Sequence, residues 1–341
     1  MPRPDRAQYR RQAWPRPLLD RNPQGDPRRL GAELEFIGVT PQDAAEEERR
    51  LFGVELDPIS DYEIAVRDTR HGDYNVEMDM TYLKERGRKR DAEGGSLEDV
   101  AEEVAEGVIA LVAKQLVPVE IVTPPIPMND LWELEDLVRA VRKLGGKGTT
   151  HSPQYAFGLH FNPELPALDG ETLRRYLQAF LCLYPWLLRR SDVDLSRRIT
   201  PYIDPFPRSY LKLVLQPDYV PDRATLIDDY LEHNATRNRA LDMLPVFKHV
   251  DEDRVLAVVD DRRVKSRPTL HYRLPNCQLD EPEWQLVHPW RDLLQLDALA
   301  AQPKVLAEAC AYCYERADSL REWLFGNWAE TAYDWVLPEL L

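Results

Sequence analysis

The chain has 341 residues, of which 43% are hydrophobic and 30% are charged. This composition is typical of a globular protein and excludes fibrous, collagen-like and intrinsically disordered classes. The 59 acidic and 44 basic residues give a net charge of −15, a field that repels phosphate backbones and anionic lipid. No stretch approaches the roughly 18 consecutive apolar residues of a membrane span. We therefore expect neither a nucleic-acid-binding protein nor a membrane protein.

The charge is distributed unevenly along the chain. The first 30 residues hold eight Arg and three Asp, a net charge of +5, so the remainder carries −20. A Pro- and Arg-rich start predicts an extended arm over residues 1–29, followed by a single domain over 30–341 because no linker or repeat divides the rest. Four cysteines are too few for a disulfide scaffold and no leader opens the chain, which predicts a cytoplasmic protein.

Hydrophobic periodicity predicts alternating strands and helices. Apolar residues at spacings of three and four indicate helices, and strict alternation of apolar with polar residues indicates strands. In chain order, we expect strands at 33–37 and 76–81, a helix at 96–116, a strand at 117–123, a helix at 131–144, a strand at 157–162, helices at 171–188 and 223–244, strands at 270–274 and 283–286, and a helix at 298–324. The fold class is therefore α+β, with the helices covering one face of a sheet.

The predicted strands all separate apolar from polar side chains. Alternate residues of a strand point to opposite faces, so Leu34 and Phe36 share one face while Glu33 and Glu35 share the other, about 7 Å apart. On the polar side, the remaining strands place Glu77, Asp79, Glu120, His160, Asn162, Arg273 and Glu283. If the strands join in one sheet, its polar face is a cup of carboxylates with a basic wall.

This polar face has two explanations. Antiparallel sheets often expose one polar face to water, and each strand alone fits that ordinary reading. Several carboxylates that face one another, however, repel each other and destabilise a sheet unless cations neutralise them. Oxygen ligands with one imidazole suit Mg²⁺ or Mn²⁺, so we predict a site for one of these ions.

Three ordered motifs resemble those of a known family. They are GAELE at residues 31–35, VEIVTPP at 119–125 and GLHFN at 158–162. Their order resembles the amidoligase family, a branch of the glutamine synthetase-like carboxylate–amine ligases. The resemblance implies an antiparallel sheet curved into a trough, with ATP and two or three divalent ions on the concave face and helices packed on the convex face.

The resemblance also implies roles for individual residues. By motif, the metal ligands are Glu33, Glu35, Glu120 and His160. Asp79, Arg273 and Glu283 match catalytic positions, with Arg273 facing phosphate.

One motif departs from the family pattern, because Gln285 stands where the resemblance leads us to expect an Arg after Glu283. Glutamine has no cationic fork for phosphate, so another arginine must supply it. The candidates are Arg267, Arg239, Arg263 and Arg237, and we assign nucleotide binding to Arg273, Arg267 and Arg239.

The implied activity is an ATP- and Mg²⁺-dependent ligase that activates a carboxylate as an acyl phosphate and joins it to an amine. Its base is Glu77, Asp79 or Glu283, and the sequence does not choose among them. Its substrates are a small-molecule or peptide carboxylate and an amine, and an oligomer is compatible with the sequence. Two alternatives stay open: a phosphotransferase on the same site, and a non-catalytic member that binds a nucleotide or partner, which Gln285 suggests.

Overall fold

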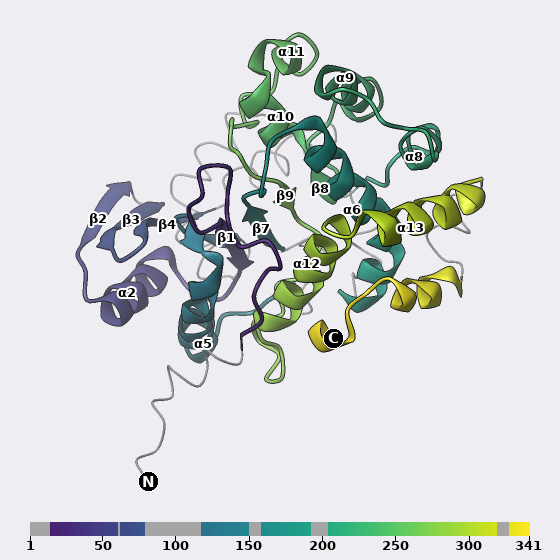
Figure 1. Ribbon diagram of the computed structural model, residues 1–341. Helices are drawn as coiled ribbons and strands as arrows, with labels where there is room; N and C mark the ends of the chain where they lie inside the picture. The colour runs from purple at the N-terminus through teal and green to yellow at the C-terminus, as the bar shows by residue number, and fades with distance from the viewer. Residues whose placement is uncertain (1–13, 61, 79–116, 150–157, 192–203, 319–326) are drawn as a thin grey trace, which may run out of the picture.

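The computed structural model describes residues 14–60, 62–78, 117–149, 158–191, 204–318 and 327–341. Its centre is one antiparallel sheet (Figure 1). The strands are β1 (Arg29–Phe36), β2 (Leu56–Ser60), β3 (Glu63–Thr69), β4 (Gly72–Met78), β5 (Val119–Val122), β6 (Ile126–Pro127), β7 (Leu159–Pro163), β8 (Leu241–Asp242) and β9 (His271–Tyr272). Their order in the sheet is β2-β3-β4-β5-β1-β7-β9-β8, and β6 also pairs with β1. The expected mixed α+β class is confirmed.

Helices occupy much of the remaining described chain. They are α2 (Pro41–Phe52), α5 (Leu134–Lys143), α6 (Gly170–Arg190), α8 (Arg208–Leu215), α9 (Arg223–Asn234), α10 (Leu244–Val250), α11 (Glu252–Leu256), α12 (Val287–Ala300) and α13 (Pro303–Arg316), with 3₁₀ helices η1 (Met128–Glu133), η3 (Asn327–Asp334) and η4 (Pro338–Leu340). The predicted helices at 131–144 and 171–188 are confirmed as α5 and α6. The helix predicted at 96–116 lies outside the described residues.

Two long predicted helices are wrong in their extent. The helix expected at 223–244 ends at Asn234, because the chain folds back there and the Asn234 side chain accepts a hydrogen bond from Arg239 Nε at 2.8 Å. Residues 241–242 then form β8 instead. Up to residue 318, the helix expected at 298–324 is divided between α12 and α13, since Pro303 lacks the N–H that a continuous helix needs and instead opens α13. Residues 319–324 lie outside the described residues.

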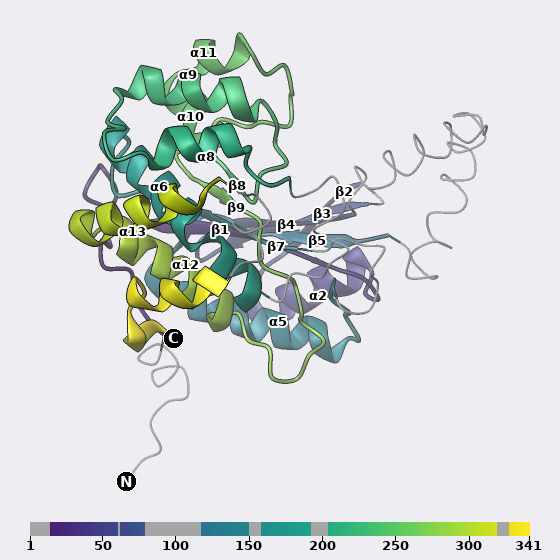
Figure 2. The ribbon, with the colours of Figure 1, turned by 90° about the vertical axis from the view of Figure 1, so that its right-hand side faces the viewer.

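The two faces of the sheet differ as the alternation predicts. The residues of β1 that point to one face, Leu30, Ala32, Leu34 and Phe36, are almost fully buried in the core. Figure 2 views the strands nearly edge-on and shows α2 and α5 together on one side of them. Further along the sheet, Phe180 of α6 meets the ring of Tyr272 edge-on at 6.2 Å.

The expected trough is not seen, because the sheet is not strongly curled (Figure 2). Bulges and register shifts are the usual means of bending a sheet. Here the register shifts lie in the β2–β3 and β3–β4 pairs near one edge. The pairings from β4 through β5 and β1 to β7 run in unbroken register.

The described part of the predicted basic arm, residues 14–28, is anchored to the domain near both of its ends. Trp14 is buried, and Trp290 Nε1 of α12 donates to the carbonyl oxygen of Pro15 at 2.9 Å. Arg28 is 2% exposed, and its Nη1 lies 2.8 Å from Asp297 Oδ1. Tyr176 of α6 also donates to that carboxylate. The described part of the arm is therefore docked on α12 and α6, while the boundary at residue 30 stays a prediction.

We expect Arg28→Met to lower the free energy of unfolding by about 3–5 kcal/mol, because it leaves the buried Asp297 carboxylate without its cation. Arg28→Met with Asp297→Leu removes both charges and should recover much of this loss. Urea unfolding measures both variants. Arg67→Met is the control, since Arg67 pairs with Asp57 and Asp73 at the surface, where a pair contributes at most about 1 kcal/mol. An Arg28→Met loss no larger than that of the control would contradict this reading.

Helix α2 buries the carboxyl group of Glu48, and neither of its oxygens has a hydrogen-bond partner in the described residues. Burial holds the pKa of Glu48 well above its ordinary value. The folded state thus binds this proton more tightly than the unfolded state. The contribution of this proton to the free energy of unfolding is fully present below the ordinary pKa of Glu. It is lost as the pH rises through the raised pKa of Glu48 in the folded state.

Glu48→Leu should therefore stabilise the protein by about 1–3 kcal/mol at neutral pH, because it removes an unsatisfied buried group. It should also flatten the fall in stability with rising pH. Urea unfolding at a series of pH values upward from about 4, near the ordinary pKa of Glu, measures both effects. Glu46→Leu, at an exposed position of the same helix, is the control. An unchanged pH slope in Glu48→Leu would show that Glu48 does not cause it.

Candidate functional site

A line of glutamates crosses four adjacent strands on the polar face. Glu35 of β1 is directly opposite Glu120 of β5, and Glu120 is directly opposite Glu77 of β4. Glu77 is in turn opposite Glu63 of β3. Directly opposed residues of antiparallel strands place their Cβ atoms about 4.5–5.5 Å apart on the same face. The sequence predicted a shared face for the first three, and the register makes them a single line.

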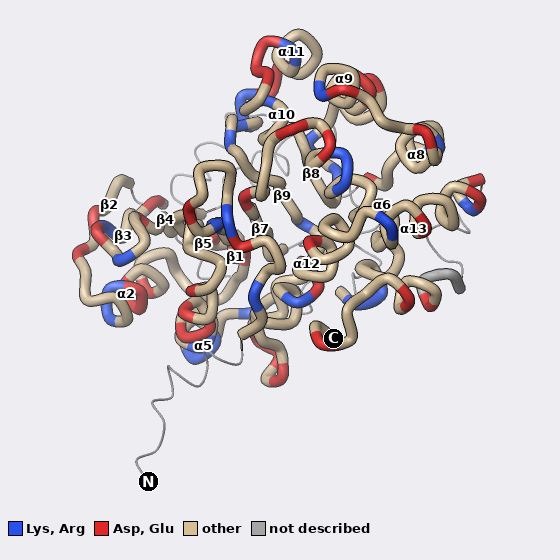
Figure 3. The backbone as a smooth tube through the Cα atoms, viewed as in Figure 1, with Lys and Arg blue, Asp and Glu red and all other residues tan. Residues whose placement is uncertain are grey.

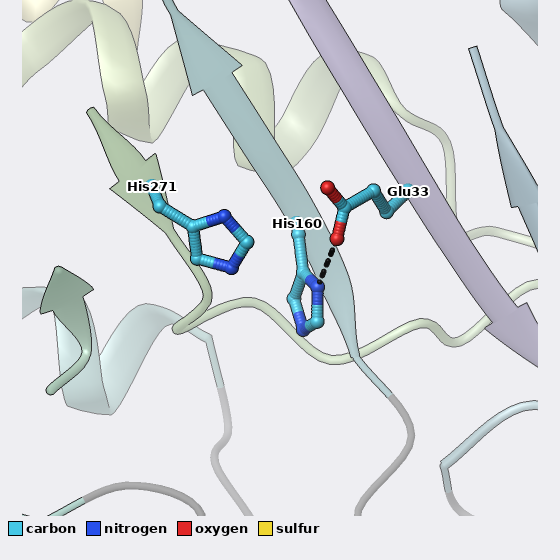
Figure 4. Close-up of side chains that lie close together, drawn as sticks. All are labelled: Glu33, His160 and His271. Carbon is cyan, nitrogen blue, oxygen red and sulfur yellow. Dashed lines mark hydrogen bonds and ion pairs between the residues drawn. The ribbon is translucent and has the colours of Figure 1, made fainter. Parts of the chain in front are cut away.

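Glu33 and His160 continue this polar face toward the other half of the sheet. The two residues are directly opposite each other on β1 and β7. His160 Nδ1 lies 2.9 Å from Glu33 Oε2 (Figure 4). His160 Nε2 lies 3.7 Å from Glu35 Oε1. Glu35, Glu120 and His160 offer ligand atoms that all lie within 4.8 Å of one another. The structure thus brings the four predicted metal ligands together.

Hydrogen bonds from neighbouring groups hold the two carboxylates of β1. Asn162 Nδ2 donates to Glu33 Oε1 at 2.9 Å, and the backbone N–H of Gly158 donates to Glu35 Oε2 at 2.7 Å. Burial by itself would raise the pKa of Glu33, but its interactions with His271 and His160 and the hydrogen bond from Asn162 outweigh it. The pKa of Glu33 is therefore held well below its ordinary value, and the group is an anion at neutral pH.

His271, at the start of β9, is a site residue that the sequence reasoning missed. Its ring centroid lies 5.1 Å from that of His160, and Glu33, His160 and His271 offer ligand atoms within 4.8 Å of one another (Figure 4). Burial and then the charge of Arg273 lower the pKa of His271 well below its ordinary value, so the imidazole is neutral. The available signal was its alternation with Tyr272, which places His271 on the same face as Arg273.

Two of the arginines predicted to bind nucleotide lie at the site. Arg273 Nη2 donates to His271 Nε2 at 3.0 Å, and Arg267 Nη1 lies 3.6 Å from Glu33 Oε1. Close by, burial and the charges of Arg273 and Arg263 lower the pKa of Arg237. Within the ranges that the structure describes, no hydrogen bond or ion pair reaches the Arg237 side chain.

Arg239 is engaged elsewhere. Its guanidinium donates to Asn234 Oδ1 at 2.8 Å, to the carbonyl oxygen of Pro205 at 2.6 Å and to that of His233 at 3.3 Å. These contacts tie the end of α9 to the segment before β8. They give Arg239 a structural role between these segments.

Glu283 does not join the polar face, and the strand predicted at 283–286 is wrong. These residues form turns ahead of α12. The carbonyl oxygen of Trp284 accepts from Arg142 Nη2 of α5 at 2.8 Å. The apparent alternation arises because Trp284 and Leu286 are both buried while Glu283 and Gln285 are exposed. The remaining predicted residue, Asp79, lies outside the described residues.

A third group of possible ligands, His71, Asp130 and Glu133, lies away from the polar face at the β3–β4 turn and η1. Arg70 pairs with both of its carboxylates, and His71 Nε2 lies 3.0 Å from Glu133. Because its anions are already neutralised by side chains, we interpret this group as an ion-pair cluster. Elsewhere, Figure 3 shows acidic and basic residues side by side on α2, α5, α9 and α11, so the net negative charge is mixed with positive charge there.

The donor set of the polar face fits hard divalent cations. Carboxylate oxygens suit Mg²⁺ and Mn²⁺, and a neutral imidazole adds a nitrogen ligand. Directly opposed carboxylates on adjacent strands are costly to the sheet, and a divalent cation between them relieves that cost. The residues present therefore fit a metal centre.

Comparison with known proteins gives one result. The family described as putative amidoligase enzymes matches residues 26–295, a span that contains every strand of the sheet. No curated protein and no solved structure gives a significant match. Among the helices that the structure describes, none is long and apolar enough to cross a membrane.

We expect Glu120→Gln to raise the free energy of unfolding in EDTA by up to about 1 kcal/mol, because it removes the middle one of three directly opposed like charges. The same variant should lose most of the stabilisation by divalent cation. In the wild type, that stabilisation is about 2.7 kcal/mol when Mn²⁺ is at 100 times its Kd. Urea unfolding with and without Mn²⁺ measures both effects, and Glu55→Gln at an exposed position is the control. Equal Mn²⁺ stabilisation in wild type and Glu120→Gln would remove Glu120 from the ligand set.

Proposed function

Since the chain belongs to the family of putative amidoligase enzymes, we propose that it is an ATP- and Mg²⁺-dependent carboxylate–amine ligase. The family implies amide-bond formation. The observation that supports the ATP-dependent form is the line from Glu77 through Glu120 and Glu35, which continues at Glu33 and His160. Such a gathering of anions suits metal ions that carry nucleotide phosphates.

The proposed reaction has two steps. A carboxylate resists attack by an amine because its carbon is a poor electrophile and oxide is a poor leaving group. Transfer of the γ-phosphoryl group from ATP to the carboxylate gives an acyl phosphate and ADP. The amine then attacks the acyl carbon, the C–N bond forms, and the C–O bond to phosphate breaks to release inorganic phosphate.

We assign Glu33, Glu35, Glu120 and His160 as the residues that hold the cations. When bound, these cations neutralise and orient the phosphate oxygens during transfer. The hydrogen bonds from Asn162 and Gly158 hold the β1 carboxylates in place before any ligand arrives. Such prior orientation lowers the cost of reaching the reactive geometry.

Arg273 and Arg267 supply the cationic forks for phosphate in this proposal. A guanidinium binds phosphate with two parallel N–H donors, which glutamine and lysine do not provide. Both residues lie at the Glu33–His271 end of the site. Arg237 joins them as a third candidate in place of Arg239, whose donors are engaged by three other groups.

The amine needs a base, because an ammonium ion has no lone pair for attack. Among the described residues we assign this role to Glu77, which lies next to Glu120 in the line of glutamates and accepts a hydrogen bond from Asn75 Nδ2 at 2.7 Å. Asp79 stays a second candidate. Glu283 does not, because its segment packs beside α5.

The structure bears differently on the two alternative functions, a phosphotransferase and a non-catalytic binding protein. A phosphotransferase would use the same groups and stop after the first step. The non-catalytic reading depended on Gln285 at a phosphate-facing position of a strand. Because residues 283–286 form turns ahead of α12, Gln285 gives no reason to expect a defective site.

Calorimetric titration of Mg-ATP, with EDTA as the reference, tests the proposal without knowledge of the substrate. We expect metal-dependent binding in the wild type and its loss in Glu120→Gln. A screen of carboxylates with ATP and hydroxylamine should then trap an acyl phosphate as a hydroxamate. Glu35→Gln and His160→Ala should reduce its formation about 100-fold or more, because both remove groups that position the transferred phosphoryl group.

Glu46→Gln, on the exposed side of α2, is the matched control and should behave as the wild type. Wild-type hydroxamate formation in Glu35→Gln and His160→Ala would rule out the proposed metal centre. A stable phosphorylated product in the absence of any amine would instead favour the phosphotransferase.

A further inference from the structure

The site contains two sets of possible ligands with different chemistry, and they meet at His160. Glu35 and Glu120 face each other on β1 and β5 and offer oxygen atoms, with His160 completing the set. On the other side, His160 lies near both Glu33 and His271, so that set contains one carboxylate and two imidazoles (Figure 4). The proportion of nitrogen to oxygen therefore changes across His160.

We infer that Glu33, His160 and His271 form a cation subsite that prefers a nitrogen-binding transition metal, such as Co²⁺ or Zn²⁺, over Mg²⁺. Glu35 and Glu120 form the oxygen-rich part that prefers Mg²⁺ or Mn²⁺. This inference rests on the proposed function in that both use the same metal centre. It adds His271 as a ligand and assigns a class of metal to each side of His160.

Ligand chemistry supports the division. Imidazole nitrogen suits Zn²⁺, Co²⁺ and the neighbouring transition metals, whereas carboxylate oxygen suits Mg²⁺ and Mn²⁺. One carboxylate and two imidazoles is a common donor set for transition metals and an unusual one for Mg²⁺, which holds oxygen ligands. The burial of His271, which is 8% exposed, also excludes the water that Mg²⁺ tends to retain.

The two nitrogens of His160 fit this arrangement. Nδ1 faces Glu33 at 2.9 Å, and Nε2 faces Glu35 at 3.7 Å. A neutral imidazole that binds a metal through one nitrogen carries a proton on the other. Ligation through Nδ1 beside Glu33 leaves Nε2–H directed at the Glu35 carboxylate. A carboxylate on the Nε2 side favours the tautomer that leaves Nδ1 free to bind a metal.

Arg273 couples this subsite to the phosphate groups. Its Nη2 donates to His271 Nε2 at 3.0 Å. A cation bound at Nε2 displaces this donor, and a cation bound at Nδ1 leaves a proton on Nε2, which cannot accept from Arg273. In either case His271 releases Arg273. Repulsion between the cation and the guanidinium acts in the same direction, so metal binding weakens the contact between Arg273 and His271.

Titration of the full-length protein with Co²⁺ alone, followed by visible absorption and by dialysis with metal analysis, tests the inference. Competition with Mg²⁺ gives the ratio of the two affinities. We expect His271→Ala to lower the Co²⁺ affinity at least about tenfold and to change the absorption spectrum, because a nitrogen ligand is lost. His271→Glu should restore cation binding but shift the affinity ratio toward Mg²⁺.

His249→Ala, at an exposed position in α10, is the control and should leave both affinities unchanged. Circular dichroism checks that each variant is folded. An unaltered Co²⁺ affinity and spectrum in folded His271→Ala would overturn the inference, and Glu120-dependent binding of Mg-ATP would show that the proposed function survives it. If the wild type binds neither Co²⁺ nor Mg-ATP, both proposals fail.

Discussion

The candidate site depends on the register of β1 against its two neighbours. Glu35 meets Glu120 on β5, and Glu33 meets His160 on β7, because β1 pairs with both strands without a register shift. A slip by one residue would turn every side chain of β1 to the opposite face. Leu34 prevents this, since it packs in the core directly opposite Ile121 on one side and Leu159 on the other. Burial of the apolar face therefore positions the carboxylates of the polar face.

That same register imposes a cost on the fold. A sheet that places like charges directly opposite each other is less stable than one that separates them. The apolar face supplies the compensation, because each fully buried aliphatic or aromatic side chain stabilises a fold by about 1.5–3 kcal/mol. Natural proteins commonly accept such a local loss where function needs it. The hydrogen bonds from Asn162 and Gly158 then restrict the β1 carboxylates to one arrangement.

The sequence predicted well which side chains lie on each face of the sheet, and it predicted less well which strands are adjacent. Alternation along β1, β4, β5 and β7 predicted correctly which side chains share the polar face. It failed at 283–286, because Trp284 and Leu286 are buried in a turn region with the same spacing as in a strand. Glu63 was missed because the residues after it, Ile64, Ala65 and Val66, are all buried and hide any alternation. Which strands adjoin is decided by packing between distant segments, and no short pattern in the chain records it.

The polar face is also graded in charge from one end to the other. Glu63 and Glu77 lie on β3 and β4 beyond the proposed ligands, whereas Arg267 and Arg273 lie beyond them on the side of β9. A carboxylate–amine ligase must hold a cation, the protonated amine, and several anions, the carboxylate and the phosphates. The acidic end attracts the protonated amine, and the basic end attracts the carboxylate and the phosphates. In the proposed reaction, the metal ligands Glu35, Glu33 and His160 then lie between the amine at the acidic end and the carboxylate and phosphates at the basic end. The phosphoryl group leaves and the amide bond forms at this position.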